Sequence, residues 1–132
     1  MATITADYSL LDGTRAAVGR AGSHVVLADR ALGVAGGEGL GFNGGQLLAL
    51  ALGGCFCNDV QYTAEEMGEA ISDLRVSVKL ELAGDPLVAT HADVSVICSL
   101  ASGADPGPLL DRAKARCTIA NTLRAGVEVS FS

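Results

Sequence analysis

The sequence has few positive charges, and no segment gathers them. It carries nine Lys and Arg residues against fifteen Asp and Glu residues, so the net charge is −6 at pH 7. Nucleic-acid binding usually depends on a basic patch or stripe that neutralises phosphates. We therefore expect no nucleic-acid partner.

Long apolar runs and an export signal are also missing. The composition is 49% hydrophobic, yet the longest apolar stretch, residues 47–57, is well short of the roughly 20 residues that span a bilayer. Residues 1–8 contain neither the basic nor the apolar segment of a secretory signal, and four cysteines in such a chain favour reduced thiols. We expect a cytoplasmic protein without a membrane partner. Its surplus apolar surface is expected to lie in an oligomer interface.

A single α+β domain is expected over residues 1–132. The predicted elements are strands at 3–10, 14–19 and 23–28, a helix at 46–68, strands at 74–82 and 92–100, a helix from Asp105 to about Leu123 and a strand at 127–131. The two long strands alternate apolar and polar residues, so each has one buried face. The order β-β-β-α-β-β-α-β describes antiparallel sheets around a buried central helix.

A glycine-rich loop precedes the central helix. Seven of the thirteen residues in 33–45 are glycine, and each would cost about 1 kcal/mol relative to alanine inside a helix. Two interpretations stay open, a flexible surface linker or a loop over a site where glycine allows close backbone approach. A phosphate-binding loop is excluded, because the Lys-Ser/Thr ending is missing.

The central helix is expected to begin after Asn43 as N-cap and to end at Gly68. Its first half is apolar on every face, which predicts burial all round. The pair Gly53-Gly54 costs about 2 kcal/mol in mid-helix. Close approach of another backbone at that point is the simplest compensation.

Cys55 in the central helix and Cys117 in the second helix are the candidate redox-active residues. Cys98 falls in a long strand, where a structural role is expected. Cys57 follows Cys55 by two residues, and side chains at i and i+2 on a helix point about 200° apart, so these two cannot chelate one ion. No Cys-x-x-Cys or His pair completes a site. We expect neither a metal nor a cofactor.

Two segments resemble the OsmC/Ohr family, which covers osmotically inducible protein C and organic hydroperoxide resistance proteins. The first is GGEGLGFNGGQLLALALGGCF at 36–56, and the second is AKARCTIANTLRAGVEV at 113–129. Each alone is a weak signal, but both occur in order with fitting elements between them. The resemblance extends over nearly the whole chain.

The resemblance implies an OsmC-like fold, an intertwined homodimer and a thiol-dependent peroxidase. Cys55 would attack the O–O bond of an organic hydroperoxide and become a sulfenic acid, and Cys117 would resolve it to a disulfide. An external dithiol, a lipoylated protein in the Ohr branch, would reduce that disulfide. Arg20, with Arg15 in reserve, would stabilise the thiolate, and Gln46 matches a position on the substrate side.

The sequence departs from the family pattern at the start of the helix and after the second cysteine. Gly45 replaces a glutamate that pairs with the arginine, and Glu38 is the only nearby acid that could stand in. Thr118 replaces a proline. Asp59, one turn beyond Cys55, would raise the thiol pKa if it faces the sulfur. The alternative function is therefore a non-catalytic dimeric scaffold or small-molecule-binding protein with a degraded peroxidase site.

Overall fold

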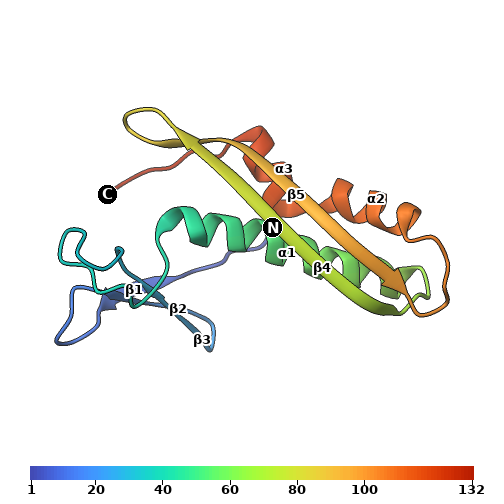
Figure 1. The fold of residues 1–132 in the computed structure, drawn as a ribbon, viewed down its shortest axis with the longest axis horizontal. Coiled ribbons are helices and arrows are strands. Elements are labelled where there is room, and N and C mark those ends of the chain that lie inside the picture. The colour runs from blue at the N-terminus through green and yellow to red at the C-terminus, as the bar shows by residue number, and fades with distance from the viewer. The chain divides into compact units, whose positions relative to one another are not determined.

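Two compact units make up the computed structural model, which describes every residue from Met1 to Ser132. They comprise residues 1–47 and 48–132. The element order is β-β-β-α-β-β-α-α (Figure 1). The α+β class is confirmed, and both sheets are antiparallel. One domain over 1–132 stays a prediction.

The first unit is built on a three-stranded sheet in the order β1-β2-β3. Its strands are β1 (Asp7–Leu10), β2 (Ala17–Ala21) and β3 (His24–Ala28). The β2–β3 turn consists of Gly22 and Ser23, because Ala21 pairs with His24. Gly22 takes a φ of 59° there, which glycine adopts without strain. All three predicted strands are present, although β1 begins at Asp7 rather than at residue 3, and β2 runs from Ala17 to Ala21 rather than over 14–19.

The glycine-rich loop is a folded part of the first unit, held by the buried carboxylate of Asp29. Asp29 Oδ2 accepts hydrogen bonds from the backbone N–H of Leu40 at 3.0 Å and of Glu38 at 3.1 Å. These bonds, Leu40 first, hold the pKa of Asp29 below its ordinary value. A Cβ on Gly37 would lie 2.6 Å from the carbonyl oxygen of Ala31. Close backbone approach therefore explains glycine at this position.

Gly37→Ala is predicted to destabilise the protein by about 1–3 kcal/mol, the usual cost of overpacking. The backbone carbonyls facing position 37 cannot move aside as a flexible side chain would. Gly44→Ala is the matched control, because no atom lies within 4 Å of a Cβ there. Denaturant unfolding of both variants checks the prediction, and equal stabilities would contradict it.

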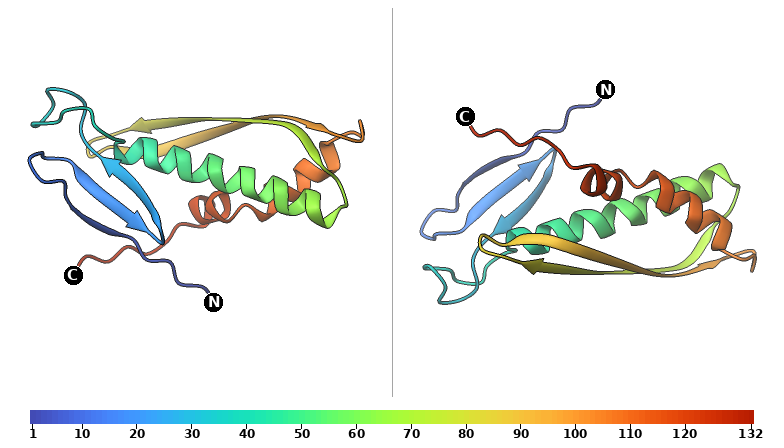
Figure 2. Two further views of the ribbon diagram at one scale, coloured as in Figure 1. Left: turned by 90° about the horizontal axis from the view of Figure 1, so that it is seen from below. Right: turned by 90° about the horizontal axis from the view of Figure 1, so that it is seen from above.

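The second unit packs helices on one face of a long hairpin. Its elements are α1 (Gly44–Glu66, entering from the first unit), β4 (Ile71–Ala83), β5 (Val88–Leu100), α2 (Gly107–Arg116) and α3 (Thr118–Ala125). Both views of Figure 2 place the three helices on the same side of β4 and β5. The predicted pair of alternating strands is confirmed. Val76 pairs with Val96, and both are half-buried.

The start of α1 is capped reciprocally by Asn43 and Gln46. Asn43 Oδ1 accepts from the Gln46 backbone N–H at 2.8 Å, and Gln46 Oε1 accepts from the Asn43 N–H at 3.0 Å. Such a capping box satisfies two donors that the first turn leaves free. The predicted N-cap is confirmed, and α1 ends two residues before Gly68, where φ is 68°.

One face of α1 forms the core of the second unit. Leu52, Phe56, Val60 and Ala64 follow each other every fourth residue and pack with α2. The prediction of burial all round is wrong for a single chain, since Leu50 on the other face is 54% exposed. The apolar sequence of α1 predicts that all of its faces are buried, whereas the other elements of this chain bury only one of them.

The close neighbour at the glycine pair is a side chain. A Cβ on Gly53 would lie 3.1 Å from Val78 Cγ2 on β4, whereas nothing lies within 4 Å at Gly54. The expectation of close packing holds at Gly53. No other backbone of this chain comes within 4 Å of a Cβ at either glycine, so the expected backbone approach stays a prediction.

The single second helix predicted from Asp105 to about Leu123 is wrong. The chain forms α2 and α3 with Cys117 between them in an extended conformation, φ −62° and ψ 108°. Asn121 Nδ2 donates to the Ala115 carbonyl oxygen at 3.1 Å. This bond satisfies one of the acceptors left free where α2 ends. The helix also begins later than predicted, with Pro106 rather than Asp105 at the N-cap position.

The strand predicted at 127–131 is also wrong for the chain by itself. These residues pair with no strand, and Phe131 is 97% exposed. Apolar alternation predicts a strand only where an edge can accept it. None of the three helices combines the length and the apolar character that crossing a membrane requires.

Candidate functional site

The two candidate cysteines lie against each other inside the second unit. Cys55 is on α1 and half-buried, and Cys117 sits at the α2–α3 break with 1% of its surface exposed. Their Sγ atoms lie within 4.8 Å of each other and of a carboxylate oxygen of Asp59. Both thiols are free. The fold thus brings together two sulfurs from residues 62 positions apart in the sequence.

Asp59 faces the Cys55 thiol from one helical turn away. Cys55 Sγ donates a hydrogen bond to Asp59 Oδ2 at 3.5 Å, and Asp59 is only 7% exposed. Burial first, then Cys117 and Asp59, raise the pKa of Cys55, while the backbone N–H of Ile119 in the first turn of α3 lowers it. The sequence-based expectation for Asp59 is confirmed. These neighbours and the burial therefore favour the protonated form of the Cys55 thiol.

Arg116 supplies the cation beside this carboxylate. Its Nε lies 3.9 Å from Asp59 Oδ1, and its Nη1 donates to Glu66 Oε2 at 2.8 Å. Its guanidinium also lies 6.0 Å from the centre of the Tyr62 ring. The ion pair with Glu66 raises the pKa of Arg116. Sequence reasoning missed this residue, although its position directly before Cys117 was the available signal.

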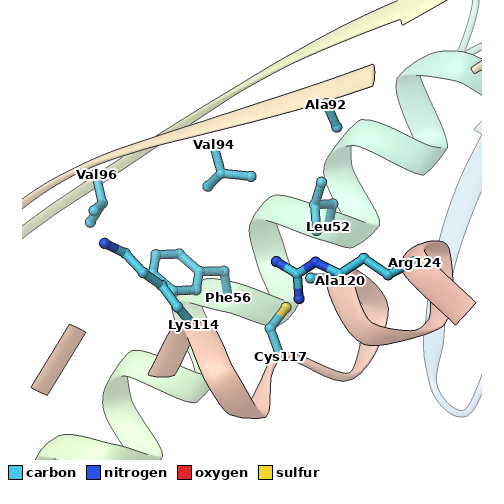
Figure 3. A pocket seen from close by; sticks show the side chains of 9 residues that line it. All are labelled: Leu52, Phe56, Ala92, Val94, Val96, Lys114, Cys117, Ala120 and Arg124. Atoms are coloured by element: carbon cyan, nitrogen blue, oxygen red, sulfur yellow. The ribbon is translucent and has the colours of Figure 1, made fainter. Parts of the chain in front are cut away.

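A cavity of about 240 Å³ opens beside Cys117 (Figure 3). Its apolar walls come from α1, β5 and α3, and consist of Leu52, Phe56, Ala92, Val94, Val96 and Ala120. Two cations, Lys114 of α2 and Arg124 of α3, line the same space. Both were also missed from the sequence, because only the bend at Cys117 turns the two helices toward one cavity.

Cys57 and Cys98 lie outside the cluster of Cys55, Asp59 and Cys117. Cys98 on β5 packs against the core of the second unit, and burial raises its pKa. These features agree with the structural role predicted for it. Cys57 is half-buried on α1. The two residues are natural controls for experiments on Cys55 and Cys117.

The remaining predicted site residues lie in the first unit. Arg20 is exposed on β2, and Arg15 Nη1 donates to the Ala35 carbonyl oxygen at 3.5 Å. Gln46 uses its side-chain oxygen in the helix cap, and Glu38 has an exposed side chain. The roles of Arg20 at the thiolate and Gln46 at the substrate stay predictions.

Comparison with known proteins decides the family. The model of the OsmC-like protein family matches residues 36–132, which include α1, the long hairpin and both cysteines of the pair. The chain belongs to the OsmC-like family. No curated protein matches it by sequence.

Solved structures with an OsmC-like fold cover almost the whole chain. An OsmC-like protein of unknown function from Vibrio cholerae has a TM-score of 0.77 at 14% identity, with 92% of this chain and 94% of that one covered. An organic hydroperoxide resistance protein from Legionella pneumophila gives 0.65 at 21%, covering 98% and 95%. A third, an organic hydroperoxide resistance protein from Elizabethkingia anophelis, gives 0.66 at 18%, covering 98% and 93%. At such identities the likeness confirms the OsmC-like fold.

Alkylation of Cys55 is predicted to speed up as pH rises through 7 to 9. Because the pKa of Cys55 is raised above the usual value of about 8.5, the thiolate fraction grows about tenfold per pH unit below that pKa. Asp59→Asn removes a charge that raises the pKa, so its Cys55 reacts faster at pH 7. Peptide-resolved iodoacetamide kinetics measure both effects. A flat wild-type profile, or a slower Asp59→Asn reaction, would contradict them.

Proposed function

We propose that this OsmC-like protein is a thiol-dependent peroxidase that reduces organic hydroperoxides. The observation that carries the proposal is the approach of Cys55 and Cys117 to within 4.8 Å, half-buried and buried respectively. The apolar cavity beside Cys117 supports a substrate with a hydrocarbon tail. The hydroperoxide resistance proteins among the structural neighbours support the same reaction class.

Cys55 takes the role of the attacking sulfur. Its thiolate bonds to one peroxide oxygen, the O–O bond breaks, and the other oxygen leaves as an alcohol once protonated. Cys55 is then a sulfenic acid, oxidised by two electrons. The Cys117 sulfur attacks Cys55, water leaves, and a disulfide forms. An external dithiol returns both thiols by exchange and becomes a disulfide itself.

Asp59 is the base that removes the thiol proton of Cys55, which the raised pKa makes harder to lose. Its Oδ2 already accepts the thiol hydrogen, so it takes the proton as the sulfur attacks. The same carboxylate then delivers that proton to the leaving alkoxide. Arg116 lies on the other side of this carboxylate, with its Nε 3.9 Å from Asp59 Oδ1. The N–H of Ile119 stabilises the developing negative charge on sulfur.

The reductant and the location follow from this chemistry. A dithiol is the matching electron donor, because two thiol–disulfide exchange steps reduce the Cys55–Cys117 disulfide and leave a disulfide on the donor. A lipoylated protein is one such dithiol. The cytoplasm is the compartment in which dithiols and free cysteines are kept reduced.

Cys55→Ser is predicted to abolish cumene hydroperoxide reduction with dihydrolipoamide as donor, because the attacking sulfur is gone. Asp59→Asn is predicted to lose about 10²-fold or more in turnover, the usual share of general acid–base catalysis. This loss would occur even though its Cys55 alkylates faster at pH 7. Steady-state alcohol production measures both. Full activity in Cys55→Ser would disprove the assignment.

The role of Cys117 has a separate readout. After one equivalent of peroxide, peptide mapping should recover a Cys55–Cys117 crosslink in the wild type and in Cys98→Ser. In Cys117→Ser, Cys55 should instead proceed to sulfinic acid with excess peroxide. If the wild type is inert to peroxide under all conditions, the protein is the non-catalytic scaffold or binder.

The assembly proposed for this activity is an intertwined homodimer. Two exposed apolar features of the second unit support it, the outer face of α1 around Leu50 and the unpaired segment from Val127 to Phe131. A strand-forming segment without a partner is completed by a second copy at low cost. Homodimers typically have interfaces more apolar than ordinary surface.

Sedimentation is predicted to give twice the mass of one chain at micromolar concentration. Leu50→Lys places a charge on the apolar face and should shift the mass toward one chain. Lys79→Glu on exposed β4 surface is a charge-changing control that should leave the mass unchanged. A stable, folded wild-type monomer would rule out an obligate dimer.

A further inference from the structure

The thiol cluster has the composition of a metal site as well as that of a redox centre. Cys55 Sγ, Cys117 Sγ and an Asp59 carboxylate oxygen all lie within 4.8 Å of one another. These three donors cannot be recognised from their spacing in the sequence. Cys55 and Asp59 are one helical turn apart, but Cys117 comes close to them only because of the bend between α2 and α3. The adjacent Cys57, which attracts notice in the sequence, takes no part.

The separations fit one tetrahedral ion. Zinc binds thiolate at about 2.3 Å and carboxylate at about 2.0 Å, so the S···O edge of a tetrahedral site is about 3.5 Å. Cys55 Sγ and Asp59 Oδ2 lie 3.5 Å apart. The corresponding S···S edge is about 3.8 Å. From a separation of 4.8 Å at most, the sulfurs would move together by no more than about 1 Å, and Cys117 Sγ would approach the Asp59 oxygen by no more than about 1.3 Å.

The surroundings also fit a divalent ion. With both thiols deprotonated, the three donors carry three negative charges, and a 2+ ion balances two of them. Arg116, which lies 3.9 Å from Asp59 Oδ1 and is shared with Glu66 at 2.8 Å, offsets part of the third. The two carboxylate oxygens are divided between Arg116 and Cys55, so the arginine fixes the carboxylate orientation from outside the donor set, as outer-shell partners do.

We infer that the reduced protein binds one thiophilic divalent cation of the zinc type per chain through Cys55, Asp59 and Cys117. Two thiol protons are released on binding, and water completes the fourth position. Three protein ligands and a water in the fourth position are the usual arrangement of a catalytic zinc site. Cation binding ties up both sulfurs, so it competes with peroxide for the same residues.

Cobalt(II) titration of the reduced, metal-free protein tests the inference directly. We expect one equivalent to bind with visible bands of tetrahedral cobalt and a thiolate-to-metal charge-transfer band, and zinc to displace it stoichiometrically. Cys55→Ser and Cys117→Ser should each weaken binding by more than about 100-fold, beyond the cost of even an outer-shell change. Cys57→Ser and Cys98→Ser are the matched controls and should bind like the wild type.

The carboxylate needs its own variants, because Asp59 is buried. Asp59→Asn should weaken cobalt binding by about tenfold or more, with circular dichroism confirming that it is folded. Asp59→Cys should restore binding and add a third thiolate contribution to the charge-transfer band. A spectrum unchanged in either cysteine variant, no charge-transfer band, or an unaffected Asp59→Asn would overturn the three-donor site.

These measurements are independent of catalysis. Metal binding is followed without peroxide, and peroxidase activity is assayed on chelator-treated protein. A protein that binds cobalt through the three donors but reduces no peroxide retains the metal site and refutes the enzyme. A protein that reduces peroxide but gives no cobalt spectrum supports the enzyme and refutes the metal site.

Discussion

The backbone of Cys117 leaves the helical conformation for a single residue, with φ of −62° and ψ of 108°. That departure turns the C-terminal helical segment into two helices and buries the Cys117 side chain against α1. It also starts α3 afresh, so its first-turn N–H groups have no helical acceptors. One of them, from Ile119, lowers the pKa of the Cys55 thiol. The sulfur pair, the polarity around it and the cavity between the helices all depend on this bend.

The hairpin of β4 and β5 could be predicted from the sequence, because alternation over nine residues has one simple solution, a strand with one buried face. The cap at Asn43 was equally local. Cys55 and Cys117 were paired through the family resemblance, since residues so far apart cannot be paired from spacing. The pKa effect of Asp59 followed from its position one turn along the same helix.

The bend at Cys117 was not predicted, because residues 105–123 carry a helical pattern throughout, and the bend goes with the packing of Cys117 in the core with Leu52 and Phe56 of α1. The same limit hid the two cavity cations, Lys114 and Arg124. The errors at Leu50 and at 127–131 have another cause. Apolar patterning states which residues avoid water, but it does not identify the element, or the chain, that covers them.

The distance along the chain between the two sulfurs has a consequence for the stability of the fold. A covalent link between α1 and the start of α3 would enclose the whole hairpin and α2 in one ring of some sixty residues. In the chain-entropy description, closing a ring of that size removes unfolded conformations worth about 4 kcal/mol. The oxidised chain would then resist unfolding by heat better than the reduced one.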